Sequence, residues 1–205
     1  MRSTQAPSYR FHHRLHIALI IALAGLLAGA LGSGAAWAQT DTSEASVPTR
    51  YQQRPEADPA DVKSPDAIVS AVYEAVSRPA EEEPDWERFR SLFLPEARFI
   101  PTFRQEGEPP YLVVGVEGFI KQYNKRIGKT DFYEREIHAV AERFGDIAHV
   151  FSTYVSSRSP DGEPFMRGIN SFQLWYDTDH DRWWVVNVMW HTEREGAPIP
   201  ERYQK

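Results

Sequence analysis

The spacing of apolar residues along the chain changes near Asp131. Before this position, apolar residues recur every three or four positions, which is the period of an α-helix. After it they alternate with polar residues every two positions, which is the period of a β-strand. The sequence therefore predicts helices early and strands late, which is an α+β layout in which a sheet curls around the helices.

Three helices are predicted in the early part. The first begins at Ser64, whose hydroxyl can cap the helix, with Pro65 in the first helical turn. Its apolar stripe consists of Ile68, Val72 and Val76. The second helix begins at Asp85, and the third follows Gly115. Short strands are predicted between the second and third helices at 98–103 and 111–114.

Four longer strands are predicted after the third helix, and tight turns join them into an antiparallel meander. Their ranges are 132–144, 147–158, 165–176 and 182–191. The last two flank an acidic turn, 177–181, and form a hairpin rich in aromatic and β-branched residues.

The final hairpin carries one amide, Asn170, among large apolar residues. Strict alternation places it on one face with Phe172, Val188 and Trp190. Such a polar group indicates either a ligand pocket or a packed core with one satisfied amide. The same alternation places Trp183, Val185 and Met189 on the opposite face, where an apolar stripe favours a partner, most simply a second copy of the chain.

The first 38 residues have the pattern of a secretory signal peptide. Three arginines precede an uncharged apolar run, Ile17 to Leu31, and a small-x-small site predicts cleavage after Ala38. The rival interpretation, an uncleaved anchor, is disfavoured because a spanning helix needs about 20 apolar residues. The sequence therefore predicts a periplasmic or secreted protein with no membrane contact after cleavage. The predicted parts are a signal peptide 1–38, a flexible leader 39–63, a domain 64–192 and an extended tail 193–205.

Composition excludes several functions. The segment after the signal holds 20 basic and 29 acidic residues, a net charge of −9, which argues against nucleic acid as a partner. The chain has no cysteine, and therefore no disulfide and no lipid-anchored thiol. The sequence shows no metal-ligand spacing, phosphate loop or nucleophile elbow, so neither a metal nor a cofactor is predicted.

The motifs from residue 64 to about 192 resemble the NTF2-like superfamily, which includes the SnoaL-like proteins. The resemblance is carried by 85–99, by 115–119, by Ile169-Asn170-Ser171-Phe172 and by Trp183-Trp184-Val185-Val186. It implies a cone in which a curved antiparallel sheet wraps around three helices and encloses a deep pocket. It also implies frequent dimerisation through the convex sheet face.

One member of that superfamily, ketosteroid isomerase, uses an aspartate base, a tyrosine and a protonated aspartate. The position matching the base is about Pro101, which cannot accept a proton. Asn170 matches the protonated acid and can still donate a hydrogen bond to a ligand oxygen. Tyr73 matches the tyrosine, although a one-residue shift would place Val72 there. The resemblance therefore argues against an isomerase of this type.

His149 is the remaining candidate for proton transfer, because it lies on the strand 147–158 on the same face as Phe151. The alternative is a histidine that is hydrogen-bonded within the sheet. The predicted ligand-binding residues are Tyr73, His149, Phe151, Asn170, Phe172, Val188 and Trp190.

Three functions are consistent with these patterns. The preferred one is an exported domain that binds a small, partly hydrophobic molecule. The second is a SnoaL-like enzyme of the isomerase, cyclase or dehydratase type, with His149 as base and Asn170 as oxyanion donor. The third is a non-catalytic dimerisation or interaction module, whose pocket would be filled by its own side chains.

Overall fold

A computed structural model describes residues 54–102 and 112–204. The predicted signal peptide, 1–38, and most of the predicted leader lie outside the described residues. Within the described ranges, none of the helices has the length and apolar content that a membrane crossing requires.

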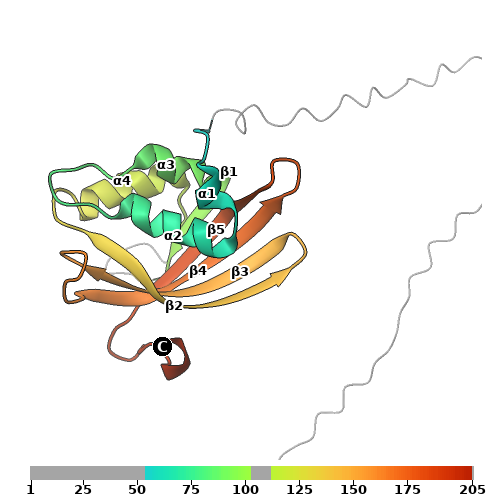
Figure 1. Ribbon diagram of the computed structural model, residues 1–205. Coiled ribbons are helices and arrows are strands. Elements are labelled where there is room, and N and C mark those ends of the chain that lie inside the picture. Colours follow the sequence, from blue (N-terminus) through green and yellow to red (C-terminus); the bar gives the residue numbers. More distant parts are fainter. Residues whose placement is uncertain (1–53, 103–111, 205) are drawn as a thin grey trace, which may run out of the picture. The chain divides into compact units, whose positions relative to one another are not determined.

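Five strands form one curved sheet, and the helices lie on its concave side (Figure 1). The strands are β1 Phe93–Pro101, β2 Tyr133–Phe144, β3 Ile147–Ser157, β4 Met166–Asp177 and β5 Arg182–Thr192. Their order across the sheet is β1-β5-β4-β3-β2. The predicted α+β class and the predicted meander of four antiparallel strands are confirmed.

The resemblance implied a curved antiparallel sheet; the sheet is curved but mixed, because β1 runs parallel to β5. A parallel pair needs a long crossover, and here the chain from α4 to β4 supplies it. β1 also begins earlier than predicted, at Phe93, and includes Pro95, which an edge strand tolerates. Of the short strand predicted at 111–114, residue 111 lies outside the described residues, and the rest makes one bridge, between Phe99 and Val114.

The helices are α1 Pro59–Val62, α2 Pro65–Val76, α3 Trp86–Ser91 and α4 Val116–Arg126, followed at the end of the chain by the short 3₁₀ helix η2, Glu201–Tyr203. The predicted caps form. Ser64 Oγ accepts a hydrogen bond from the amide of Ala67 at 3.1 Å, and Asp85 Oδ1 accepts one from the amide of Arg88 at 2.9 Å. The three predicted helices therefore correspond to α2, α3 and α4.

Aromatic rings fill the core between α3, α4 and β1. Phe89 lies 4.6 Å from Phe93 and 5.2 Å from Phe119 between ring centroids, and Phe99 lies 4.4 Å from Phe119. Phe89 and Phe93 are fully buried. Each such side chain contributes about 1.5–3 kcal/mol through burial of apolar surface, so this cluster anchors the helices to the edge of the sheet.

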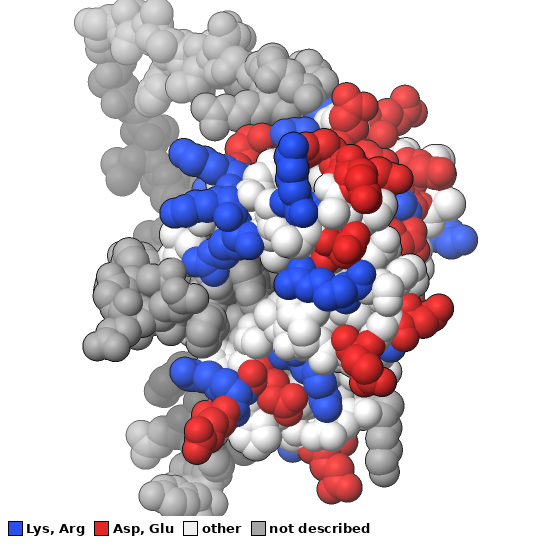
Figure 2. Space-filling view, turned by 90° about the vertical axis from the view of Figure 1, so that its left-hand side faces the viewer, with Lys and Arg blue, Asp and Glu red and all other residues white. Residues whose placement is uncertain are grey.

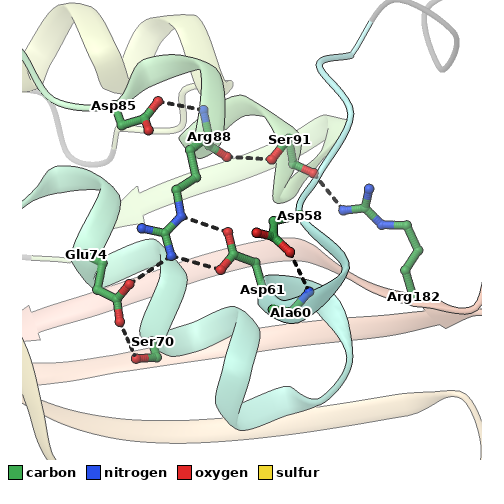
Figure 3. Close-up of polar contacts among 9 residues, drawn as sticks. All are labelled: Asp58, Ala60, Asp61, Ser70, Glu74, Asp85, Arg88, Ser91 and Arg182. Carbon is green, nitrogen blue, oxygen red and sulfur yellow. Dashed lines mark hydrogen bonds and ion pairs between the residues drawn. The ribbon is translucent and has the colours of Figure 1, made fainter.

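The end of the predicted leader belongs to the folded domain. Residues 59–62 form helix α1, and Val62 is buried. Arg88 on α3 holds this helix in place, because its guanidinium donates to both carboxylate oxygens of Asp61, at 2.7 and 2.8 Å, and to Glu74 at 2.8 Å (Figure 3). The expectation of flexibility up to residue 63 rested on composition alone, which does not reveal this bidentate ion pair.

A β-bulge on β5 changes which side chains face the helices. Gln173 pairs with Asn187 but Leu174 pairs with Val185, so Val186 is an extra residue. As a result Trp183 and Val185, which strict alternation placed on the outer face, belong to the core at 1% and 0% exposure. Of the three residues in the predicted outer stripe, Met189 remains exposed.

The C-terminal tail lies on the side of the sheet opposite the helices (Figure 1). Ile199 is buried, the ring of Tyr203 lies 5.0 Å from that of Phe151, and Thr153 Oγ1 donates to the carbonyl of Tyr203 at 2.7 Å. The tail therefore covers part of the convex face.

Candidate functional site

A cavity of about 300 Å³ lies between the helices and the inner face of the sheet. This volume is at the lower end of the range found for small-molecule sites. Most of its lining is apolar or aromatic. The principal wall residues are Val72, Phe99, Phe119, Tyr123, Phe132 and Trp190, and the polar lining residues are Gln122, Arg126, Glu134, Asn170 and Thr192. The cavity therefore has an apolar body with a few polar groups.

Five of the seven predicted ligand-binding residues line this cavity. They are Tyr73, Asn170, Phe172, Val188 and Trp190. Asn170 is 8% exposed, so its amide faces the cavity rather than bulk water. Pro101 is also part of the wall.

His149 and Phe151 do not line the cavity. Val150 pairs with Phe172, and both belong to the buried core, so the residues on either side of Val150 point to the opposite face of the sheet. There His149 Nε2 lies 3.0 Å from Ser171 Oγ, and Phe151 contacts the tail. The predicted pairing of His149 as base with Asn170 as oxyanion donor is wrong, because the two side chains lie on different faces.

Glu134 on β2 is a cavity residue that the sequence analysis missed. Ser156 Oγ donates to its Oε2 at 2.8 Å, and the amide of Asn170, whose Nδ2 donates to Tyr73, lies close enough to favour the ionised carboxylate. Burial raises the pKa of Glu134 to about 7, even though these two polar neighbours lower it. This carboxyl group therefore changes charge near neutral pH, inside an apolar cavity.

A signal for Glu134 was present in the sequence. Phe132, two positions earlier, is apolar, and residues two apart share a face of a strand. The charged residues that follow, Arg135 and Glu136, gave this stretch the composition of a solvated strand.

A hydrogen-bonded chain of side chains orients the amide of Asn170. Its Nδ2 donates to the hydroxyl of Tyr73 at 3.0 Å, which leaves the Tyr73 proton to be donated to Ser152 Oγ at 2.7 Å. Ser152 in turn donates to the carboxylate of Glu136. Since each hydroxyl has one proton to donate, the chain runs in one direction from Asn170 to Glu136.

Three tyrosines near Glu134 remain neutral. Burial raises the pKa of Tyr73, Tyr123 and Tyr154 above the ordinary value, and the negative charge of Glu134 adds to this effect in each case. Glu134 is therefore the group in this cluster whose protonation changes near neutrality. Within the described ranges, no group of three or more His, Cys, Asp or Glu residues lies close enough to hold a metal ion.

No protein-family model matches the sequence, and no curated protein matches it. Among solved structures, the chain is similar to a protein of unknown function with a cystatin-like fold from Nostoc punctiforme, at 12% identity and a TM-score of 0.47, covering 62% of this chain and 87% of that chain. It is also similar to an NTF-2-like protein of unknown function from Silicibacter pomeroyi, at 19% identity and a TM-score of 0.42, covering 62% and 92%. A third similar structure is an NTF2-like protein of unknown function from Shewanella baltica. Its sequence identity is 16% and its TM-score 0.42, and the match covers 62% of this chain and 89% of that chain. These likenesses assign no role to any residue of this chain.

Proposed function

We propose that this domain binds a small, largely apolar molecule in the cavity between the helices and the sheet, with Glu134 and Asn170 as its polar contacts. The observation that carries the proposal is the joint position of these two side chains in the lining of an otherwise apolar cavity of about 300 Å³. Most small-molecule sites have this composition, with many apolar walls and a few polar groups that orient the ligand.

The cost of burying Glu134 supports a functional role. A carboxylate in an apolar cavity destabilises the folded state, and its raised pKa expresses that cost. An acid that only had to maintain the fold would be replaced by an apolar residue at no loss of stability. An acid in a cavity with a strongly shifted pKa is a candidate for a functional site.

The proposal is tested by native mass spectrometry of the protein purified from its own host. A retained small molecule is expected. Val188→Trp should abolish retention, because the larger side chain fills the cavity, whereas Met189→Trp, on the adjacent and exposed position of β5, should leave it unchanged. Equal retention by both variants would contradict a ligand in this cavity.

Acid–base catalysis with Glu134 is the second candidate, and the pKa of about 7 favours it, because a general base or acid works best near the ambient pH. The other titratable or charged groups around it are Tyr73, Tyr123, Tyr154, Glu136 and Arg126. Since the three tyrosines stay neutral, turnover of the retained molecule should change with pH near 7. Glu134→Gln should abolish turnover while binding persists; loss of both in equal measure would exclude catalysis.

Export and self-association are also part of the proposal. Cleavage after Ala38 is supported by the sequence pattern, and N-terminal sequencing of the protein from its host should begin at Gln39. A homodimer through the outer face is supported by the exposure of Val140, Ile147 and Met189, and sedimentation velocity at rising concentration tests it. The side shown in Figure 2 carries both signs of charge among its described residues, which favours neither nucleic acid nor an anionic surface as partner.

A further inference from the structure

The hydrogen-bond partners of Glu134 are neutral. Among the described residues, Ser156 donates to its carboxylate, the amide of Asn170 lies nearby, and it forms no ion pair with a lysine, arginine or histidine. A carboxylate has lone pairs for about four hydrogen bonds. These neutral neighbours therefore leave both its charge and part of its accepting capacity unmatched, on the side where it lines the cavity.

The walls around this acid are suited to a positive charge. Phe119, Tyr123, Phe132, Tyr154 and Trp190 all contribute aromatic rings to the same cavity. The faces of such rings attract cations as well as apolar groups.

From this arrangement we propose that the cavity takes a small organic amine, bound as its ammonium ion, with the charge at Glu134 and the apolar body against the aromatic walls. This inference rests on the proposed function, since it names the class of molecule that the cavity binds. An ammonium group supplies three donors and the missing positive charge. It also keeps Glu134 ionised, because an opposite charge at contact distance lowers the pKa of a carboxyl group.

An anionic ligand fits this site poorly, because its charge would meet that of Glu134. Arg126 also lines the cavity, but it lies on α4 with its residue exposed to solvent, where water and salt screen its charge. A neutral alcohol or ketone could accept a hydrogen bond from uncharged Glu134, yet it would gain no cation–π attraction from the ring faces.

The inference is tested by calorimetric titration of the full chain at pH 8 with three probes of equal carbon skeleton: 4-phenylbutylamine, 4-phenyl-1-butanol and 4-phenylbutanoate. The amine is expected to bind at least about tenfold more tightly than the alcohol, and the carboxylate most weakly. Glu134→Gln should remove the preference for the amine and leave the affinity for the alcohol within about threefold. Glu142→Gln, an exposed acid on the same strand, is the matched control and should bind like the wild type.

Each outcome is decisive for the inference. If the alcohol binds as tightly as the amine, or if Glu134→Gln keeps the preference, the amine assignment is overturned while the cavity stays a binding site. If none of the probes binds, the amine assignment is also overturned. The native mass spectrometry experiment then tests the proposed function independently. Should Glu134→Gln fail to fold, the comparison of the three probes on the wild-type chain decides alone.

Discussion

The two faces of the sheet carry similar pairs of polar side chains in different surroundings. On the inner face Glu134 and Asn170 lie close together and line a cavity. On the outer face His149 and Ser171 form a comparable contact of 3.0 Å, half-buried beside the ring of Phe151, which the tail covers. The comparison teaches that the face of the strand, more than the chemistry of the side chain, decides which polar pair can meet a ligand.

The surroundings also determine how a substitution on each face should affect the stability of the fold. On the inner face, burial among rings and aliphatic side chains raises the pKa of Glu134 to about 7. On the outer face the tail covers Phe151 and Thr153, while Val140, Ile147 and Met189 stay exposed. Substitutions on the inner face should therefore change stability and binding together, whereas those on the outer face should change stability slightly or self-association alone.

The largest difference in stability between the two faces is expected when a phenylalanine on each face, Phe172 or Phe151, is replaced by alanine. Phe172→Ala should lower the free energy of unfolding by about 3–5 kcal/mol, because Phe172 is 1% exposed and its loss enlarges the cavity. Phe151→Ala should cost about 1–2 kcal/mol, because this side chain is half-buried. Urea denaturation of both variants measures the difference, and equal costs would contradict the assignment of faces.

Glu134→Gln should change the pH dependence of stability. The pKa of Glu134 is raised in the folded state, so the folded protein binds this proton more tightly, and the contribution of Glu134 to stability falls as pH rises from about 4.5 to about 7. Above pH 7 the variant should therefore be more stable than the wild type by up to roughly 3 kcal/mol. Near pH 4 the two should agree. Thermal unfolding from pH 4 to 8 measures this effect, with the outer-face variant Glu142→Gln expected to follow the wild type.

Removing the tail tests the outer face directly. A chain that ends at Glu195 lacks Ile199 and Tyr203, and should lose about 1–3 kcal/mol of stability. It should also self-associate more strongly than the full chain, because Phe151 and Thr153 become exposed. Sedimentation velocity and urea denaturation together measure both changes. Unchanged association would show that the covered part of this face has no affinity for a second copy.

His149→Ala should have the smallest effect. The variant loses one hydrogen bond to Ser171 at a half-buried site, which is worth about 1 kcal/mol or less. Retention of the cavity's ligand should not change, because His149 does not line the cavity. If this variant keeps its fold but loses the ligand, His149 belongs to the ligand-binding site, and the register of β3 and β4 described above is contradicted.

The sequence predicted the local structure well because caps, turns and periodicity are local signals. Ser64 and Asp85 begin their helices as predicted, and the hairpin of β4 and β5 forms around the acidic turn. The same periodicity placed Asn170, Phe172, Val188 and Trp190 on one face correctly. The bulge at Val186 precedes Val188 in the chain, so it does not change the alternation between Val188 and Trp190.

The errors arose where the answer depended on contacts between distant residues. Whether His149 shares a face with Phe172 depends on the register between β3 and β4, which no local pattern reveals. Glu134 lines a cavity whose other walls come from α2, β4 and β5, which are far away in the sequence. For the same reason, the ion pair between Asp61 and Arg88 cannot be read from the composition of the leader.

The parallel pairing of β1 with β5 has a consequence for the order of events during synthesis. The ribosome releases β1 long before β5, so the main-chain groups of β1 that face β5 have no partner strand until the last strand arrives. During that interval the nascent chain exposes an unsatisfied edge rich in phenylalanine, which is a template for aggregation. Efficient production of this protein therefore depends on how quickly its final strand follows.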